Sequence, residues 1–401
     1  MPASELTKKA LLVGSSYSAA PLFFALKRRA LHVTVCGDDK DDPCHQYADA
    51  SCYIDYSNKA DLLDFVQQNS FDFLVPSCND FSYVSCSWVA RNMRFPGYDD
   101  WETALMLHTK HRFREFCEKH FVPAPVRLYY GSVTDETAAD INLPYPVLVK
   151  PVDSFSGRGT TKVVDQASLA GALLAAKAES RTSEVVVEKF LEGSLHSHSA
   201  FIEEGRIVWD GFVDEYCKVY PYQVDCSHWP SKLPEAMRRG VRNAMLEVVS
   251  KARLNDGLLH TQFIARGEDF WIVESMRRCP GDLYGRLVEE ATGLEYNDMY
   301  VAKFLGEPYG RQRPIFGAEK FVGRHTVSLS APQVCSGLAF DVPAKRISYV
   351  PLKMSGERLG TAPFDKLGIV FVEFDSAATM LKVVPNFADA IKVVSLEKTY
   401  G

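Results

Sequence analysis

A loop rich in serine and glycine is the first feature whose residue types suit a chemical task. The letters KPVDSFSGRGT cover residues 150–160 and follow a short apolar run. Small residues let backbone N–H groups come close to phosphate oxygens and form anion-binding nests. The small residues of this loop are Ser154, Ser156, Gly157 and Gly159. Lys150 and Arg158 add positive charge, so the loop predicts a polyphosphate site, with a solvated hairpin turn as the alternative.

A second group of polar residues lies on a predicted hairpin. The apolar segments 258–265 and 269–274 flank Arg-Gly-Glu at 266–268, which favours two paired strands. This pairing puts Gln262 and Glu274 at the same end of the hairpin. Their side-chain oxygens suit Mg²⁺, which takes oxygen ligands and keeps water and phosphate for its other positions. An exposed charged turn is the alternative, but it does not explain why Glu274 ends the apolar run FWIV.

The first hundred residues predict the element that precedes these groups. Strand-like runs at 9–14, 31–36 and 71–76 alternate with helix-like segments at 20–29 and 59–68. Such alternation is typical of βαβ units, so residues 1–96 are expected to form a doubly wound domain with a parallel sheet. The GxGxxG pattern of dinucleotide sites is absent, because residues 14–19 read GSSYSA. We expect a structural turn there, with a role on the substrate side.

The rest of the chain predicts two further parts. Residues 97–306 contain the two polar groups, an amphipathic stretch at 101–120, a hairpin around 203–205 and a long helix at 233–253. They are expected to form a core of two α+β subdomains. After residue 306 the sequence is punctuated by glycine and proline and is strand-like, for example at 346–352 and 368–374. Residues 307–401 therefore predict a β-rich C-terminal unit.

Composition excludes several classes of protein. The 401 residues are 46% hydrophobic and 24% charged, which is the balance of an ordinary globular protein. The net charge of −6 gives no general surface for nucleic acid or an anionic membrane. The ten cysteines form no CxxC pair, and the N-terminus lacks the features of a signal peptide. These observations favour reduced thiols and a cytoplasmic location.

Four motifs, in order, resemble those of ATP-grasp enzymes of the carboxylate–amine ligase type. They are Thr109-Lys110-His-Arg-Phe, the Val149-Lys150-Pro151 strand with its loop, VVEKFLEG at 186–193, and QF at 262–263 followed by IVESMRR at 272–278. The glutamine at the first metal position resembles the carbamoyl-phosphate-synthetase branch. The resemblance covers residues 1 to about 306, and it implies the corresponding fold for this part of the chain.

The resemblance also implies a set of site residues. Those expected to bind ATP are Lys110, Lys150, Ser154, Ser156, Gly157, Gly159, Glu188, Lys189, Leu191 and His196. Mg²⁺, with Mn²⁺ as an alternative ion, would be held by Glu274 and Gln262. Arg278 and Lys150 would act in catalysis, because a guanidinium matches a carboxylate or a phosphate in bidentate fashion.

The reaction implied is ATP-dependent and ADP-forming. A small-molecule carboxylic acid would be activated as an acyl phosphate and attacked by an amine or ammonia. For the oligomeric state, a homodimer is one of the alternatives. One departure concerns Met276, where the family usually carries asparagine, since a thioether is a poor ligand for Mg²⁺. A catalytically weak nucleotide-sensing protein is therefore one alternative. A Rossmann-type oxidoreductase is a second, disfavoured by the missing glycines.

Overall fold

The N-terminal part is a parallel four-stranded sheet with the strand order β3–β2–β1–β4. A computed structural model of the chain describes residues 7–134, 137, 141–309 and 320–397. The strands are β1 (Lys9–Val13), β2 (His32–Cys36), β3 (Ala50–Cys52) and β4 (Phe73–Pro76), and the helices are α1 (Ala20–Arg28), α2 (Lys59–Gln68) and α3 (Asp80–Met93). The predicted doubly wound sheet is confirmed. The strand order reverses between β1 and β4, where loops of such sheets bind ligands.

The amphipathic stretch at 101–120 forms two helices rather than one. These are α4 (Trp101–His108) and α5 (Lys110–His120), and Thr109 between them has an extended backbone with φ −118° and ψ 116°. Because of this break, Lys110 is the first residue of α5. The break gives α5 a direction of its own, and α5 leads into the next sheet.

A small antiparallel sheet with the order β5–β8–β6–β7 follows α5. Its strands are β5 (Arg127–Ser132), β6 (Val147–Pro151), β7 (Thr161–Val163) and β8 (Glu184–Lys189). Helix α7 (Leu169–Ala178) packs on one face and buries Leu169, Leu173 and Ala176. The loop between β6 and β7 is the serine- and glycine-rich loop of the sequence, so the sheet holds both of its ends.

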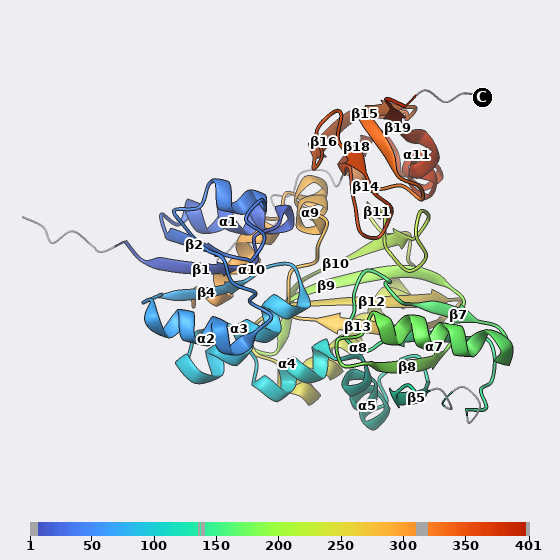
Figure 1. The fold of residues 1–401 in the computed structure, drawn as a ribbon, viewed down its shortest axis with the longest axis horizontal. Helices are drawn as coiled ribbons and strands as arrows, with labels where there is room; N and C mark the ends of the chain where they lie inside the picture. Colours follow the sequence, from blue (N-terminus) through green and yellow to red (C-terminus); the bar gives the residue numbers. More distant parts are fainter. Residues whose placement is uncertain (1–6, 135–136, 138–140, 310–319, 398–401) are drawn as a thin grey trace, which may run out of the picture.

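An eight-stranded sheet forms the centre of the molecule, with the order β13–β12–β9–β10–β11–β14–β18–β16 (Figure 1). Starting from the edge strand β13 (Asp269–Met276), its first five strands also include β12 (Gly257–Arg266), β9 (Ser194–Glu203), β10 (Arg206–Tyr216) and β11 (Cys226–Trp229). The hairpins predicted around 203–205 and 266–268 are confirmed, and Gln262 lies opposite Glu274. Helix α8 (Glu235–Ala252) packs against β10 and β13.

The C-terminal strands continue this sheet. They are β14 (Phe321–Val327), β16 (Arg346–Pro351) and β18 (Gly368–Phe374), and β14 pairs with β11. A second sheet contains β15 (Gln333–Phe340), β17 (Arg358–Leu359) and β19 (Ile391–Ser395), beside α11 (Ala377–Val383) and α12 (Phe387–Ala390). Short 3₁₀ helices occupy Tyr17–Ala19, Pro43–Gln46, Gln166–Ser168 and Val384–Asn386. Residues 1–6, 310–319 and 398–401 of the predicted terminal domains lie outside the described residues.

Two helices link the central sheet back to the N-terminal part. They are α9 (Tyr284–Thr292) and α10 (Tyr296–Phe304), and α10 packs on α1 and β4. Arg29 forms an ion pair with Asp298 of α10 at 2.8 Å. Residues 296–304, which the sequence assigns to the central part, therefore contribute to the core of the N-terminal sheet.

None of the helices in the described part of the chain is long and apolar enough to cross a membrane. The ten cysteines all lie in described segments, and each is free.

Candidate active site

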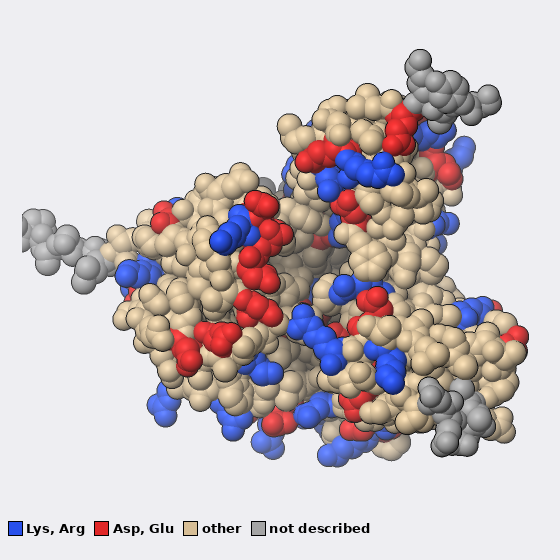
Figure 2. All heavy atoms as spheres, in the orientation of Figure 1, with Lys and Arg blue, Asp and Glu red and all other residues tan. Residues whose placement is uncertain are grey.

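The three parts of the chain surround one cavity of about 900 Å³. The loops after β1 and β4 contribute Ser16–Ser18 and Cys78–Phe81, the small sheet contributes the β6–β7 loop, and the large sheet contributes β12 and β13. Arg324 and Lys366 line it from the C-terminal part. Figure 2 shows the hollow between the N-terminal body and the rest of the molecule. Residues far apart in the sequence thus meet at one site.

Most of the residues predicted from the sequence line this cavity. They are Lys110, Lys150, Ser154, Ser156, Gly157, Glu188, Lys189, Leu191, Gln262, Glu274 and Arg278. As far as the chain is described, Gly159 and His196 are not among the lining residues. The structure therefore brings together the two polar groups that the sequence placed on separate elements.

Gly159 and His196 have other surroundings. A Cβ atom on Gly159 would lie 2.9 Å from Cβ of Glu179, so this glycine packs against the residue after α7. His196 is buried, and its Nε2 and Nδ1 lie 2.6 Å from Oγ of Ser194 and 2.8 Å from a carboxylate oxygen of Asp214. Both ring nitrogens of His196 are thus bonded inside the sheet, and its predicted place near the nucleotide stays a prediction.

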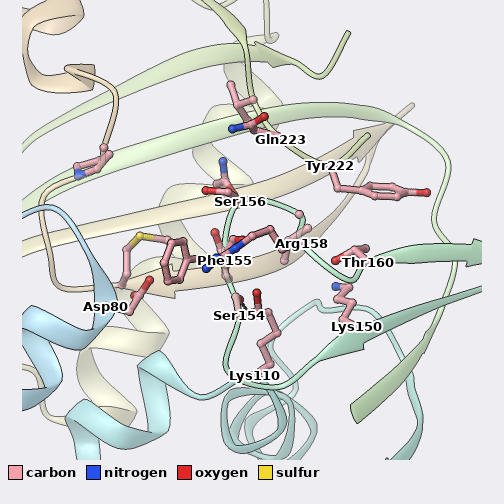
Figure 3. Close-up of a pocket in the computed structure, with 18 of the residues that line it drawn as sticks. Asp80, Lys110, Lys150, Ser154, Phe155, Ser156, Arg158, Thr160, Tyr222 and Gln223 are labelled. Carbon is pink, nitrogen blue, oxygen red and sulfur yellow. Dashed lines mark hydrogen bonds between the residues drawn. The ribbon is translucent and has the colours of Figure 1, made fainter. Parts of the chain in front are cut away.

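The β6–β7 loop has the backbone geometry of an anion-binding nest. Ser156, Gly157 and Gly159 have positive φ angles of 59°, 72° and 67°. A Cβ on Gly157 would lie 2.8 Å from the backbone of Tyr222, so only glycine fits where the loop meets residues 221–222. Lys110 donates a hydrogen bond of 2.5 Å from Nζ to the carbonyl of Ser154. Figure 3 shows Lys110 beneath Ser154 and Lys150 beside Thr160, so both ammonium groups lie along the loop.

Lys150 belongs to a buried cluster of three charges. Its Nζ lies 2.5 Å from Oε2 of Glu188, and Nε of Arg114 lies 2.6 Å from Oε1 of the same carboxylate. Burial opposes ionisation of Glu188, but Arg114 and Lys150 hold its pKa at about 2. Glu188, expected as a nucleotide contact, therefore has both oxygens bonded to cations. Arg114 was missed, although it follows Lys110 by four residues and helical spacing places the two on one face.

Gln262 and Glu274 form the candidate metal site. The amide Nε2 of Gln262 donates a hydrogen bond of 2.6 Å to Oε2 of Glu215 on β10. Because the nitrogen is used in this way, the amide oxygen of Gln262 remains for a cation. Among the described residues no three His, Cys, Asp or Glu side chains gather into a metal site. The pair fits Mg²⁺ only if phosphates and water fill the other positions, as is usual for this ion. Met276 also lines the cavity.

Arg278 is held rigidly at the cavity wall. Its NH2 donates to a carboxylate oxygen of Asp80 at 3.0 Å, and the other oxygen of Asp80 lies 2.7 Å from Nδ1 of His108. Burial opposes ionisation of Asp80, but Arg278 and His108 lower its pKa well below the usual range. Its neighbour Arg277 instead pairs with Asp99 at 2.7 Å inside the protein. Asp80 and His108 were missed, because no local pattern relates them to residue 278.

A second polar cluster, around Asp282, also lines the cavity. Asp282 accepts hydrogen bonds from Tyr17 at 2.6 Å and from Lys366, and its carbonyl accepts one of 2.9 Å from Arg324. Arg324 is 3% exposed, and its Nε has no hydrogen-bond partner within the described segments. Arg324 and Lys366 were missed, because they come from the C-terminal part, whose pairing with the large sheet no sequence motif indicates.

Comparison with known proteins agrees with this geometry. Residues 111–298 match the family model described as the carbamoyl-phosphate synthase L chain, ATP binding domain. These residues form an ATP-binding domain of the ATP-grasp type. The resemblance noted in the sequence is confirmed for this domain. The ATP-grasp ligases that the chain resembles are ADP-forming carboxylate–amine ligases.

Three relatives illustrate the match. A formate-dependent phosphoribosylglycinamide formyltransferase of Prochlorococcus marinus (strain MIT 9515) is 22% identical over 392 residues, which cover 94% of this chain and 98% of that protein. The L-amino acid ligase of Bacillus licheniformis has a TM-score of 0.79 at 16% identity, over 98% of this chain and 100% of that one. The biotin carboxylase domain of Hydrogenobacter thermophilus 2-oxoglutarate carboxylase, solved with MgADP and bicarbonate, has a TM-score of 0.75 at 14% identity, over 98% and 92%. The matched family model favours an ATP-binding domain over the alternative of a Rossmann-type oxidoreductase.

Proposed function

We propose that this ATP-grasp protein is an ADP-forming ligase that activates a small carboxylic acid as an acyl phosphate for attack by an amine or ammonia. The observation that carries the proposal is the meeting, in one cavity, of two lysines, a glycine-rich nest, a Gln262–Glu274 pair and a fixed arginine. Each of these groups suits one part of a phosphoryl transfer from ATP, which supports the proposal.

The nucleotide would lie between the small and large sheets. Lys110 and Lys150 would neutralise the triphosphate, and the backbone N–H groups of the 154–160 loop would close over it. Lys189 and Leu191, at the end of β8, would border the adenine. Gln262 and Glu274 would hold Mg²⁺, which would neutralise phosphate charge when it is bound. The protein thus contributes position and electrostatics rather than a covalent nucleophile.

The acid would lie at the far side of the γ-phosphate. Arg278 is held in one orientation by Asp80, so its guanidinium can bind the transferring phosphoryl group without reorganising. Arg324 is a buried cation near the carboxylates of Asp282 and Glu215, and its Nε has no hydrogen-bond partner in the described part of the chain. A substrate carboxylate would accept a hydrogen bond from this Nε, since buried polar groups are normally hydrogen-bonded. The amine would enter over Ser16–Ser18.

A nucleotide-sensing protein with little turnover remains the second candidate. Met276 favours it, because this side chain lines the cavity where an oxygen ligand would serve a second metal ion. A screen of carboxylic acids, with formate and amino acids first, against amines and ammonia separates the two functions. A ligase releases ADP only with a matching pair, whereas a sensor binds ATP and releases none with any pair.

Mg-ATP should stabilise the folded protein. A ligand that binds only the native state adds about 2.7 kcal/mol at ~100 times its dissociation constant. Differential scanning fluorimetry with increasing Mg-ATP should therefore show a rise in melting temperature, and EDTA should reduce it. A melting temperature that stays constant up to millimolar Mg-ATP would contradict nucleotide binding and with it the proposed reaction.

A further inference from the structure

Arg114 is a buried residue that connects the two strands, β8 and β13, on either side of the candidate nucleotide site. It lies on α5, is 2% exposed, and does not line the cavity itself as far as the described residues define it. Its Nε bonds to Glu188 on β8 at 2.6 Å, and its NH2 donates to the carbonyl of Val273 on β13 at 2.6 Å. Val273 directly precedes Glu274 in the chain. One guanidinium therefore joins the strand of Glu188 to the strand of the candidate metal ligand.

The charges of the cluster can be counted. Arg114 and Lys150 carry one positive charge each, and Glu188 carries one negative charge, so the cluster has a net charge of +1. Both oxygens of Glu188 are occupied, one by each cation. Of the two cations only Lys150 lines the cavity. The surplus positive charge is thus available at Lys150, where phosphate would lie. Without Arg114, the carboxylate of Glu188 would cancel the charge of Lys150.

We propose that Arg114 is a positioning residue that acts on ATP through Glu188 and Lys150. It neutralises Glu188 so that Lys150 presents its charge to the triphosphate, and its second bond fixes β13 beside β8 so that Glu274 is aligned with the nucleotide. The proposal rests on the proposed function, since it requires that this cavity binds ATP.

The test removes the positive charge of Arg114 and then restores the net charge of the cluster with a second substitution. The dissociation constant of ADP, measured by isothermal titration calorimetry with and without Mg²⁺, should rise about tenfold or more in Arg114→Met, because the cluster becomes neutral. The double variant Arg114→Met/Glu188→Gln restores the net charge of +1. It should recover most of the lost affinity, to within about threefold of wild type. A role in folding alone would make the double variant worse than the single one.

Arg114→Lys separates the two tasks of the residue. An ammonium keeps the charge but lacks the planar fork that reaches Glu188 and Val273 together. ADP affinity should stay within about threefold of wild type, while ADP-forming turnover should fall on the order of tenfold, because Glu274 is no longer aligned. If Arg114→Met does not fold, Arg114→Lys still allows the proposal to be tested. Tenfold weaker ADP binding in Arg114→Lys, or turnover equal to wild type, would overturn the proposal.

Arg112→Met is the matched control. Arg112 is on the same helix, is 44% exposed in its side chain and pairs with Glu102 at 3.2 Å, away from the cluster. The ADP affinity of the Arg112→Met variant should equal that of the wild-type protein. If wild type binds ADP and Arg114→Met binds it equally well, the inference about Arg114 fails. If wild type itself binds no ADP or ATP, the proposed function fails instead.

Discussion

Lys150→Ala should reduce ADP-forming turnover by about 10²–10³-fold and weaken nucleotide binding. Removing one fixed group that stabilises developing charge typically costs this much in kcat. Lys150 is 8% exposed in its side chain, and its Nζ lies 2.5 Å from Glu188, so the ammonium has a fixed position at the cavity wall. The fold should survive the change, because Glu188 keeps its ion pair with Arg114. Steady-state kinetics and ADP calorimetry measure the two effects.

Two further variants control this result. Lys150→Arg should restore activity only in part, because a guanidinium is a planar fork rather than a compact charge. Lys119→Ala removes an exposed lysine at the end of α5 and should leave turnover at the wild-type level. Wild-type ATP affinity and turnover in Lys150→Ala would show that Lys150 has no role in nucleotide binding or catalysis and is only a residue near the end of β6.

Glu274→Gln should lower Mg²⁺-dependent turnover by on the order of 10²-fold or more, because a metal ion contributes several kcal/mol of charge stabilisation to phosphoryl transfer. The amide keeps the shape of the side chain and removes one negative charge. The free energy of unfolding should change little or fall slightly, since the charged groups that interact with Glu274 include the cations Lys110 and Arg278. A Mg²⁺ titration of ATP turnover should show a higher half-saturating concentration, and chemical denaturation measures stability.

Glu268→Gln is the corresponding control, because it makes the same change at the exposed turn of the same hairpin. It should leave the Mg²⁺ titration unaltered. Full turnover in Glu274→Gln, at an unchanged Mg²⁺ requirement, would place the metal on other residues and refute the assignment of this hairpin.

Local patterns were sufficient to predict the elements of the fold that depend on near neighbours. Helix α2 has the predicted bounds, because Leu62 and Val66 recur at helical spacing and Asn58 accepts a hydrogen bond from the N–H of Ala60 at its start. The two hairpins followed from their charged turns. The break at Thr109 was not predicted, since neither glycine nor proline marks it. The pairing of β11 with β14 was not predicted either, because it joins segments separated by about ninety residues.

The residues of the site likewise fall into those that local patterns predict and those that only tertiary packing reveals. Motifs identified the residues that form contiguous patterns, such as the loop at 154–160 and the Gln262–Glu274 pair. They could not identify partners that only tertiary packing provides. Asp80 reaches Arg278 from the N-terminal sheet, and Lys366 reaches Asp282 from the C-terminal part. That His196 lies outside the cavity lining has a related reason, because alternation along a strand does not say which polar residues are bonded inside the sheet.

The fate of the carboxylate oxygen tests the central claim most directly. An acid and amine found active in the screen would be incubated with Mg-ATP, with both carboxylate oxygens of the acid labelled with ¹⁸O. An acyl phosphate requires ADP and inorganic phosphate in amounts equal to product, and mass spectrometry should find one ¹⁸O atom in that phosphate. Release of AMP and pyrophosphate, with the label in AMP, would show adenylate chemistry and contradict the account.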